Sequence, residues 1–223
     1  MRERFHGQLH VLGELLADMG GMACEELRLA NRVFLDRDVA AAAELATVEV
    51  RLNAARTDCE LTAQRLLALQ APVAGDLRTV LAAVYCADRL ERMGDLAQHI
   101  AEQAMRTPEF AVPDALTERF RELGGLACSV ADDLAATIGD PTAEAFHSLA
   151  RADERIDAIY EDLMALVTGP EWTDGVAPAI SVALLARFYE RFADQAVSVA
   201  RRMDFVLTGE LPESAVRDAP RVS

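Results

Sequence analysis

The sequence predicts an all-α protein of six long antiparallel helices, arranged as two tandem three-helix bundles that are related by an internal repeat. Three observations lead to this prediction. The composition is 52% hydrophobic but only 5% aromatic, and a balance rich in Ala, Leu, Arg and Glu favours helices over sheets. Glycine and proline are sparse, which indicates long uninterrupted elements. Finally, segments of the second half repeat segments of the first half at a fixed spacing.

Three helices are predicted in the first half, where apolar residues recur at helical spacing. The first runs from about residue 5 to residue 33 and stops near Leu35. The second covers about 39–69 and ends before Pro72. The third begins at Asp76, a good N-cap residue, and continues to about residue 105.

The second half predicts three more helices, over about 114–138, 143–167 and 178–207. Gly-Pro or Gly-Asp-Pro segments separate them, and such segments end helices. We therefore expect a first three-helix repeat over 1–106, a linker over 107–113, a second repeat over 114–208 and a flexible tail over 209–223.

The repeat is visible at two offsets. The run from Gly20 to Cys24 returns 104 positions later as Gly124 to Cys128, and the same offset carries Asn53 onto Asp157. The third and sixth helices match at an offset of 99, so the five-residue difference falls in a connection, where loops absorb length changes. Because paired glycines inside two helices are costly, we expect them to permit a close helix approach.

Acidic residues four positions apart are the main candidates for function. Glu91 and Asp95 form one such pair, which the repeat copies as Glu190 and Asp194. Residues at i and i+4 share one face of a helix, where two carboxylates repel each other unless a cation lies between them. The candidate metal ligands, taken over all four equivalent pairs, are Glu49, Glu91, Asp95, Asp153, Asp157, Glu190 and Asp194.

Asn53 breaks the pair that begins at Glu49, and this puts the first repeat's cluster in doubt. His99, four residues after Asp95, is a weaker candidate ligand because the repeat places Ser198 at its position. Oxygen-rich clusters suit Mg, Ca, Mn, Fe and, in some geometries, Zn. An alternative interpretation is a solvated surface on which arginines neutralise the acids.

No P-loop, Rossmann, GxSxG or HExxH pattern occurs in the sequence. The Glu-x-x-His pattern of ferritin-like bundles occurs at Glu3 to His6 and at Glu144 to His147, but both lie at helix starts, away from the acidic pairs. We therefore expect no enzymatic activity.

The formal net charge of −15 argues against nucleic acid as a partner, because such a partner needs a basic surface. No signal peptide, no membrane-spanning run and no basic amphipathic helix is recognisable, so we expect a cytoplasmic protein that does not insert into membranes. Four isolated cysteines fit a reducing compartment.

The chain resembles the PhoU family of phosphate-uptake regulators, and an actinobacterial member in particular. The similar segments are the two Glu-Arg-x-x-Asp motifs at Glu91 and Glu190, the Pro72 to Arg78 segment, and the run from Asp153 to Asp157. The resemblance implies acidic motifs that bind clusters of metal ions such as Fe, Zn, Mn or Mg. It also implies a homodimer that acts without catalysis.

The resemblance further implies negative regulation of the phosphate-starvation response. The implied partners are the ATPase subunit of the phosphate ABC transporter and a phosphate-responsive sensor histidine kinase. Two alternatives use the same residues differently: a carboxylate-bridged metal-dependent enzyme, or a helical bundle that stores metal. A purely structural scaffold is a third.

Overall fold

The structure is a computed structural model that describes residues 2–106, 111–140 and 142–210. This part of the chain forms six long helices and one short 3-10 turn, with no strand. The elements are α1 (Arg2–Leu35), α2 (Val39–Gln70), α3 (Ala74–Ala104), η2 (Asp114–Leu116), α4 (Thr117–Gly139), α5 (Ala143–Thr168) and α6 (Val176–Thr208). The predicted fold class is therefore confirmed.

Neither Asp76 nor Asp114, which were expected to begin helices, is the first residue of an α-helix. Asp76 is not the N-cap of α3: the cap is Val73, and Asp76 lies in the first turn, where its charge still faces the positive end of the helix dipole. Ala71 and Ala74 adopt left-handed backbone conformations, so the chain reverses earlier than the sequence indicates. Asp114 opens the 3-10 turn, and α4 follows at Thr117.

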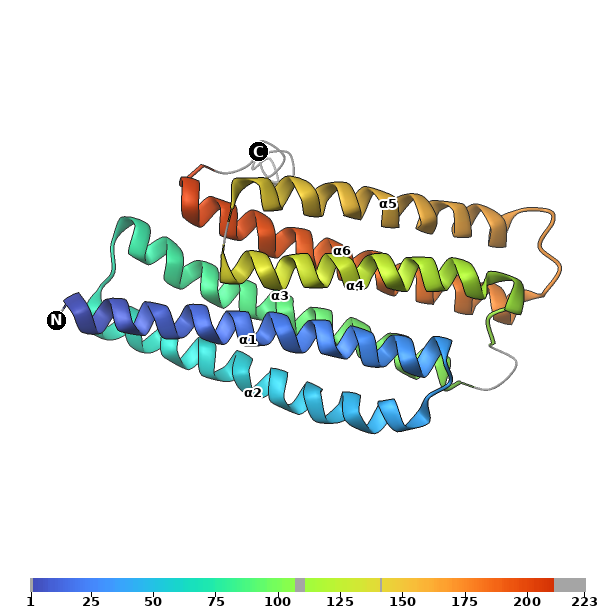
Figure 1. Ribbon diagram of the computed structural model, residues 1–223, viewed down its shortest axis with the longest axis horizontal. Coiled ribbons are helices and arrows are strands. Elements are labelled where there is room, and N and C mark those ends of the chain that lie inside the picture. Colours follow the sequence, from blue (N-terminus) through green and yellow to red (C-terminus); the bar gives the residue numbers. More distant parts are fainter. Residues whose placement is uncertain (1, 107–110, 141, 211–223) are drawn as a thin grey trace, which may run out of the picture.

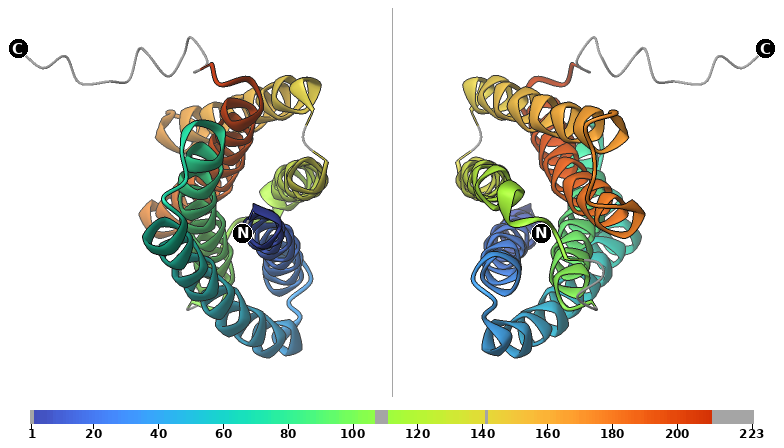
Figure 2. Two further views of the ribbon diagram at one scale, coloured as in Figure 1. Left: turned by 90° about the vertical axis from the view of Figure 1, so that its left-hand side faces the viewer. Right: turned by 90° about the vertical axis from the view of Figure 1, so that its right-hand side faces the viewer.

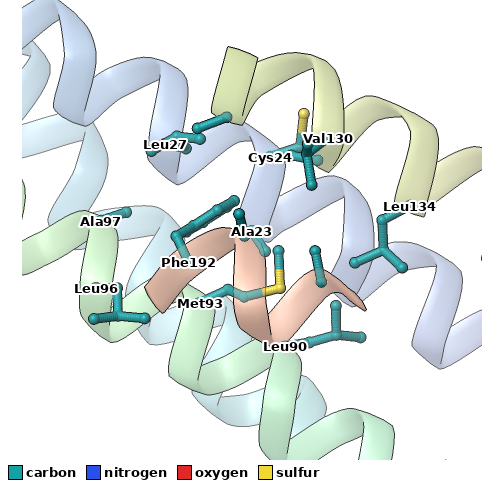
Figure 3. Packing of buried hydrophobic residues seen from close by; sticks show 14 of the residues in the cluster. Ala23, Cys24, Leu27, Leu90, Met93, Leu96, Ala97, Val130, Leu134 and Phe192 are labelled. Atoms are coloured by element: carbon teal, nitrogen blue, oxygen red, sulfur yellow. The ribbon is translucent and has the colours of Figure 1, made fainter. Parts of the chain in front are cut away.

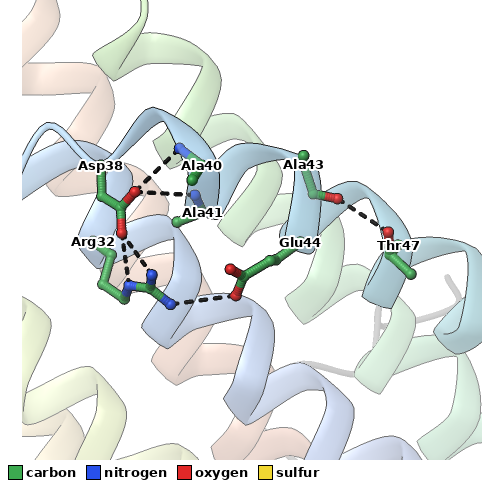
Figure 4. Close-up of polar contacts among 7 residues, drawn as sticks. All are labelled: Arg32, Asp38, Ala40, Ala41, Ala43, Glu44 and Thr47. Atoms are coloured by element: carbon green, nitrogen blue, oxygen red, sulfur yellow. Dashed lines mark hydrogen bonds and ion pairs between the residues drawn. The ribbon is translucent and has the colours of Figure 1, made fainter.

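Asp38 caps α2 at the tight turn from α1 (Figure 4). Its carboxylate accepts hydrogen bonds from the backbone N–H groups of Ala40 and Ala41, and it also pairs with Arg32 at 2.6 Å. Arg32 reaches Glu44 at 3.3 Å as well. One side chain therefore fixes both the start of α2 and its direction relative to α1.

Helices α1, α3, α4 and α6 form the centre of the molecule. Helix α2 packs on α1 and α3, whereas α5 packs on α4 and α6, so each half keeps its three-helix arrangement (Figures 1 and 2). Side chains of all four central helices meet in one hydrophobic cluster, which includes Leu27, Met93, Val130 and Phe192 (Figure 3). The two halves consequently share a core. No described helix is long and apolar enough to cross a membrane.

Glycines allow α1 and α4 to approach closely, as the repeat predicts. A Cβ at Gly20 would lie 3.1 Å from Ile138 Cδ1, and a Cβ at Gly124 would lie 2.9 Å from Asn31 Oδ1. The second glycine of each pair, Gly21 or Gly125, has no such neighbour within 4 Å. The prediction is thus confirmed for one glycine in each pair.

Polar contacts also join the two halves. The hydroxyl of Tyr189 on α6 donates to Asn31 Oδ1 on α1 at 2.5 Å, in a fully buried position. Arg89 on α3 donates to Gln195 Oε1 on α6 at 2.9 Å. The Cys24 thiol donates to Asp132 at 2.8 Å, and all four cysteines are free.

Candidate metal-binding carboxylate sites

Helices α5 and α6 bring together the four acids of the second repeat, Asp153, Asp157, Glu190 and Asp194, which we call the second carboxylate site. Burial, together with the charges of the other three acids, raises the pKa of Asp153 to about 7. The pKa values of Asp157 and Glu190 are raised as well, first by burial and then by Asp194. The predicted convergence of these four residues is therefore present in the structure.

Two oxygen atoms of the second carboxylate site are buried without a partner. Glu190 is 8% exposed, and Arg187 approaches its Oε1 at 2.7 Å. Its Oε2 and the Oδ1 of Asp153 receive no hydrogen bond in the described residues. Buried polar atoms are normally satisfied, so these two oxygens have unused capacity for a ligand.

Helices α2 and α3 bring together Glu49, Glu91 and Asp95, which we call the first carboxylate site. The Gln98 side chain donates to Glu49, and Arg92 approaches Asp95 at 3.3 Å. Burial and the charge of Asp95 raise the pKa of Glu91. Asn53, where the second repeat has Asp157, is exposed.

Glu26 on α1 is a buried acid that feels the charges of the first carboxylate site and that no repeated motif marks. It is 0% exposed, and burial raises its pKa to about 8, helped by the charges of Glu49, Asp95, Glu25 and Glu91. Neither of its carboxylate oxygens has a hydrogen-bond partner in the described residues.

A signal for Glu26 does exist in the sequence. Positions alternately three and four residues apart along α1 form its buried stripe, and Glu26 occupies one of them. The other members of this stripe are apolar: Leu12, Leu16, Met19, Ala23, Ala30 and Val33. An acid within such a stripe is expensive to bury and therefore indicates a special role.

The donor atoms of the two carboxylate sites are those that a hard cation prefers. Their present positions do not form a complete coordination sphere. In the portion of the chain that the structure describes, no three His, Cys, Asp or Glu side chains stand close enough together to hold a metal ion as they are placed. The donors are all carboxylates, and several of their oxygens are buried and unpartnered. His99 is stacked on Phe188, with 5.2 Å between the ring centroids.

The fold and these sites define a class of protein: a duplicated three-helix bundle with one group of facing carboxylates in each half. The model of the PhoU domain matches residues 16–104 and 120–203, that is, both halves. The chain belongs to the PhoU family.

Full-length relatives agree with this assignment. The chain is 37% identical over 214 residues to the phosphate-specific transport system accessory protein PhoU homolog 1 of Mycobacterium leprae, covering 96% of each chain. It is also 37% identical to PhoU homolog 2 of Mycobacterium tuberculosis, covering 95% of this chain and all of that one.

Solved structures have the same fold. The crystal structure of the phosphate transport system regulatory protein PhoU from Streptococcus pneumoniae superimposes with a TM-score of 0.83 at 28% identity, over 94% of this chain and 99% of that one. The crystal structure of PhoU from Pseudomonas aeruginosa gives a TM-score of 0.82 at 21% identity, over 92% and 100% of the two chains.

Proposed function

We propose that the protein is a cytoplasmic, non-enzymatic accessory regulator of phosphate transport, which represses the phosphate-starvation response when phosphate is plentiful. The observation that carries this proposal is the similarity to accessory proteins of the phosphate-specific transport system over nearly the whole length of both chains. The net charge of −15 supports a protein partner in preference to nucleic acid or an anionic membrane.

Within this proposal, both carboxylate sites bind divalent or trivalent metal ions such as Fe, Zn, Mn or Mg. Glu49, Glu91 and Asp95 would hold metal in the first half, and Asp153, Asp157, Glu190 and Asp194 in the second half. The unpartnered buried oxygens of Asp153 and Glu190 support this assignment in the second half. A bound cation would neutralise carboxylates that otherwise repel each other, and it would thereby hold α2 against α3 and α5 against α6.

The proposed partners are the ATPase subunit of the phosphate ABC transporter, a phosphate-responsive sensor histidine kinase and a second copy of the chain in a homodimer. The family membership supports these partners. The described surface also retains exposed apolar residues, among them Val50 and Leu69 on α2, which are available for protein contacts.

A deletion of the gene tests the regulatory role. In phosphate-rich medium, the deletion strain should express phosphate-transport genes at the level of starved cells, and the wild-type gene should restore repression. If the strain also carries a second gene of the family, both are deleted before complementation. Unchanged expression in that strain would rule out the proposed regulation.

The same carboxylates support a second candidate, a metal-dependent enzyme. A turnover screen on phosphate esters, with Mn or Fe added to the purified protein, separates the two functions. A regulator should give no turnover above that of the metal alone. Turnover that disappears in a Glu190→Gln variant would favour the enzyme.

A further inference from the structure

The carboxylate of Glu26 occupies a space that exists because residue 94 has no side chain. A Cβ placed on Gly94 of α3 would overlap Oε2 of Glu26 and would lie 2.6 Å from Leu52 Cδ2 on α2. Glu26 therefore reaches from α1 across to the place where α2 and α3 meet. The first carboxylate site lies between these same two helices.

Nothing in the described part of the molecule compensates the charge of this carboxylate. Glu26 is fully buried, and both of its oxygens lack a hydrogen-bond donor. The charged groups that act most strongly on it are all acids, namely Glu49, Asp95, Glu25 and Glu91. A buried carboxylate without a partner is costly to ionise, so Glu26 gains most from a cation placed beside it.

The second half of the protein has no such residue. At an offset of 104 the equivalent of Glu26 is Val130, and at an offset of 99 the equivalent of Gly94 is Ala193. Val130 is fully buried in the hydrophobic cluster. The repeat therefore shows that the fold accepts an apolar residue at this position. The acid at position 26 is specific to the first half.

We propose that Glu26 is the fourth carboxylate of the first site and takes the place of the acid that is absent at Asn53. The first site would then draw on α1, α2 and α3, whereas the second site uses only α5 and α6. This inference rests on the proposed binding of metal, and it adds a ligand from a helix that carries none of the repeated acidic motifs.

A metal ion would consequently join different sets of helices in the two halves. In the first half it ties α1, a helix of the shared core, to α2 and α3. In the second half α4 carries Val130 at the equivalent position and supplies no ligand. The two sites then contain equal numbers of carboxylates, and Asn53 does not make the first site the weaker one.

The experiment isolates the first site. A background variant, Glu190→Gln with Asp194→Asn, disables the second site, and Mn²⁺ alone is titrated into the metal-free protein by calorimetry. Glu26→Gln is then added to this background. We expect it to weaken Mn²⁺ binding by about tenfold or more, because even outer-shell partners of metal ligands contribute tenfold to a hundredfold.

Glu25→Gln in the same background is the matched control. It removes the same charge one residue away, but Glu25 is half exposed and its nearest cation is Arg51 at 4.0 Å. Binding in this control should change less than about twofold, since a surface charge contributes little.

A second variant guards against a failure to fold. Glu26→Val combined with Gly94→Ala copies Val130 and Ala193 into the first half. Because the second half already folds with this pair, we expect unchanged circular dichroism together with the same loss of Mn²⁺ affinity.

The outcomes separate a failure of the proposed role of Glu26 from a failure of the proposed metal sites. Equal effects of Glu26→Gln and Glu25→Gln, or no binding at all by the background variant, would overturn the role of Glu26 while leaving metal binding by the wild type intact. Absence of Mn²⁺ binding by the wild-type protein would instead overturn the proposed metal sites themselves.

Discussion

At the scale of single residues, small differences between equivalent positions distinguish the acidic groups of the two halves. Gly94 leaves room for the Glu26 carboxylate, whereas its equivalent is Ala193. Asn53 removes a charge that Asp157 supplies in the other half. The fold tolerates both versions, so these positions tune the sites without altering the helices.

Gly94→Ala should destabilise the metal-free protein by about 1 to 2 kcal/mol, because the added methyl group meets the ends of Glu26 and Leu52 in a packed interior. Urea denaturation measures the change. Gly125→Ala is the control: it lies in the middle of α4, where a Cβ has no neighbour within 4 Å, and it should stabilise the protein by about 0.5 to 1 kcal/mol. Equal effects would contradict the close contact at Gly94.

Asp38→Ala should lower the melting temperature at neutral pH and make no difference in strong acid. The hydrogen bond from Arg32, and after it those from the backbone of Ala41 and Ala40, lower the pKa of Asp38 below its usual value. Its contribution is therefore complete above the unfolded pKa of about 4 and is lost as the pH falls through the lower folded value. Thermal melts of both proteins between pH 7 and pH 2 check this prediction, and a constant difference would contradict it.

The motifs of the sequence indicated the candidate ligands of both halves but gave no indication of Glu26. Repeated i, i+4 spacing paired Asp153 with Asp157 and Glu190 with Asp194, and in the structure the charges of the other three acids act on Asp153; their role as ligands stays a prediction. Glu26 was missed because neither repetition nor pairing marks it. Only its place in a buried stripe does, and burial depends on how the helices pack.

At the scale of helices, the positions of helix-breaking residues were enough to predict the boundaries of most elements. Proline and glycine in the connections, such as Pro72 and Gly209, interrupt the helical pattern, so the predicted boundaries lie within three residues of the observed ones. The start of α3 was misjudged because it depends on left-handed backbone at Ala71 and Ala74, residues that do not favour this conformation.

Facing acids on α5 and α6 should make stability depend on metal. In the double variant Glu190→Gln with Asp194→Asn, we expect the metal-free protein to be at least as stable as the wild type, because repulsion is relieved. The increase in melting temperature on adding Mn²⁺ should fall to what the first site supplies. Melts with chelator and with Mn²⁺ measure both quantities.

The control for this pair is Glu171→Gln with Asp174→Asn, which makes the same charge change in the exposed connection between α5 and α6. It should leave the metal-linked increase unaltered. If chelator leaves the wild-type melting temperature unchanged, the acids are instead a surface neutralised by arginines such as Arg187 and Arg92.

At the scale of the whole molecule, the two halves behave as one structure because four helices share the core. We expect a single thermal transition. The fluorescence of the one tryptophan, Trp172 in the second half, should change at the same temperature as the circular dichroism of all helices. Separate transitions would show that the halves unfold independently.

Tyr189→Phe should lower this common transition, because it leaves the half-buried Asn31 Oδ1 without the donor that Tyr189 supplies. The cost is about 1 to 2 kcal/mol, which corresponds to roughly 2 to 8 °C for a chain of this size. Tyr160→Phe is the control, since the hydroxyl of Tyr160 makes no hydrogen bond within the described residues, and it should have little effect. A shift in only the fluorescence of Trp172 would contradict the shared core.

The contact between α1 and α4 has a symmetry that follows from the duplication. Gly20 meets Ala135, while Gly124 meets Asn31, and 31 and 135 are equivalent positions at the offset of 104. Likewise Arg28 binds Asp132, which is its own equivalent. Contacts of this reciprocal kind are those of a twofold pair of identical subunits. The contact between α1 and α4 thus has the geometry of an interface between two identical half-length subunits, within one polypeptide.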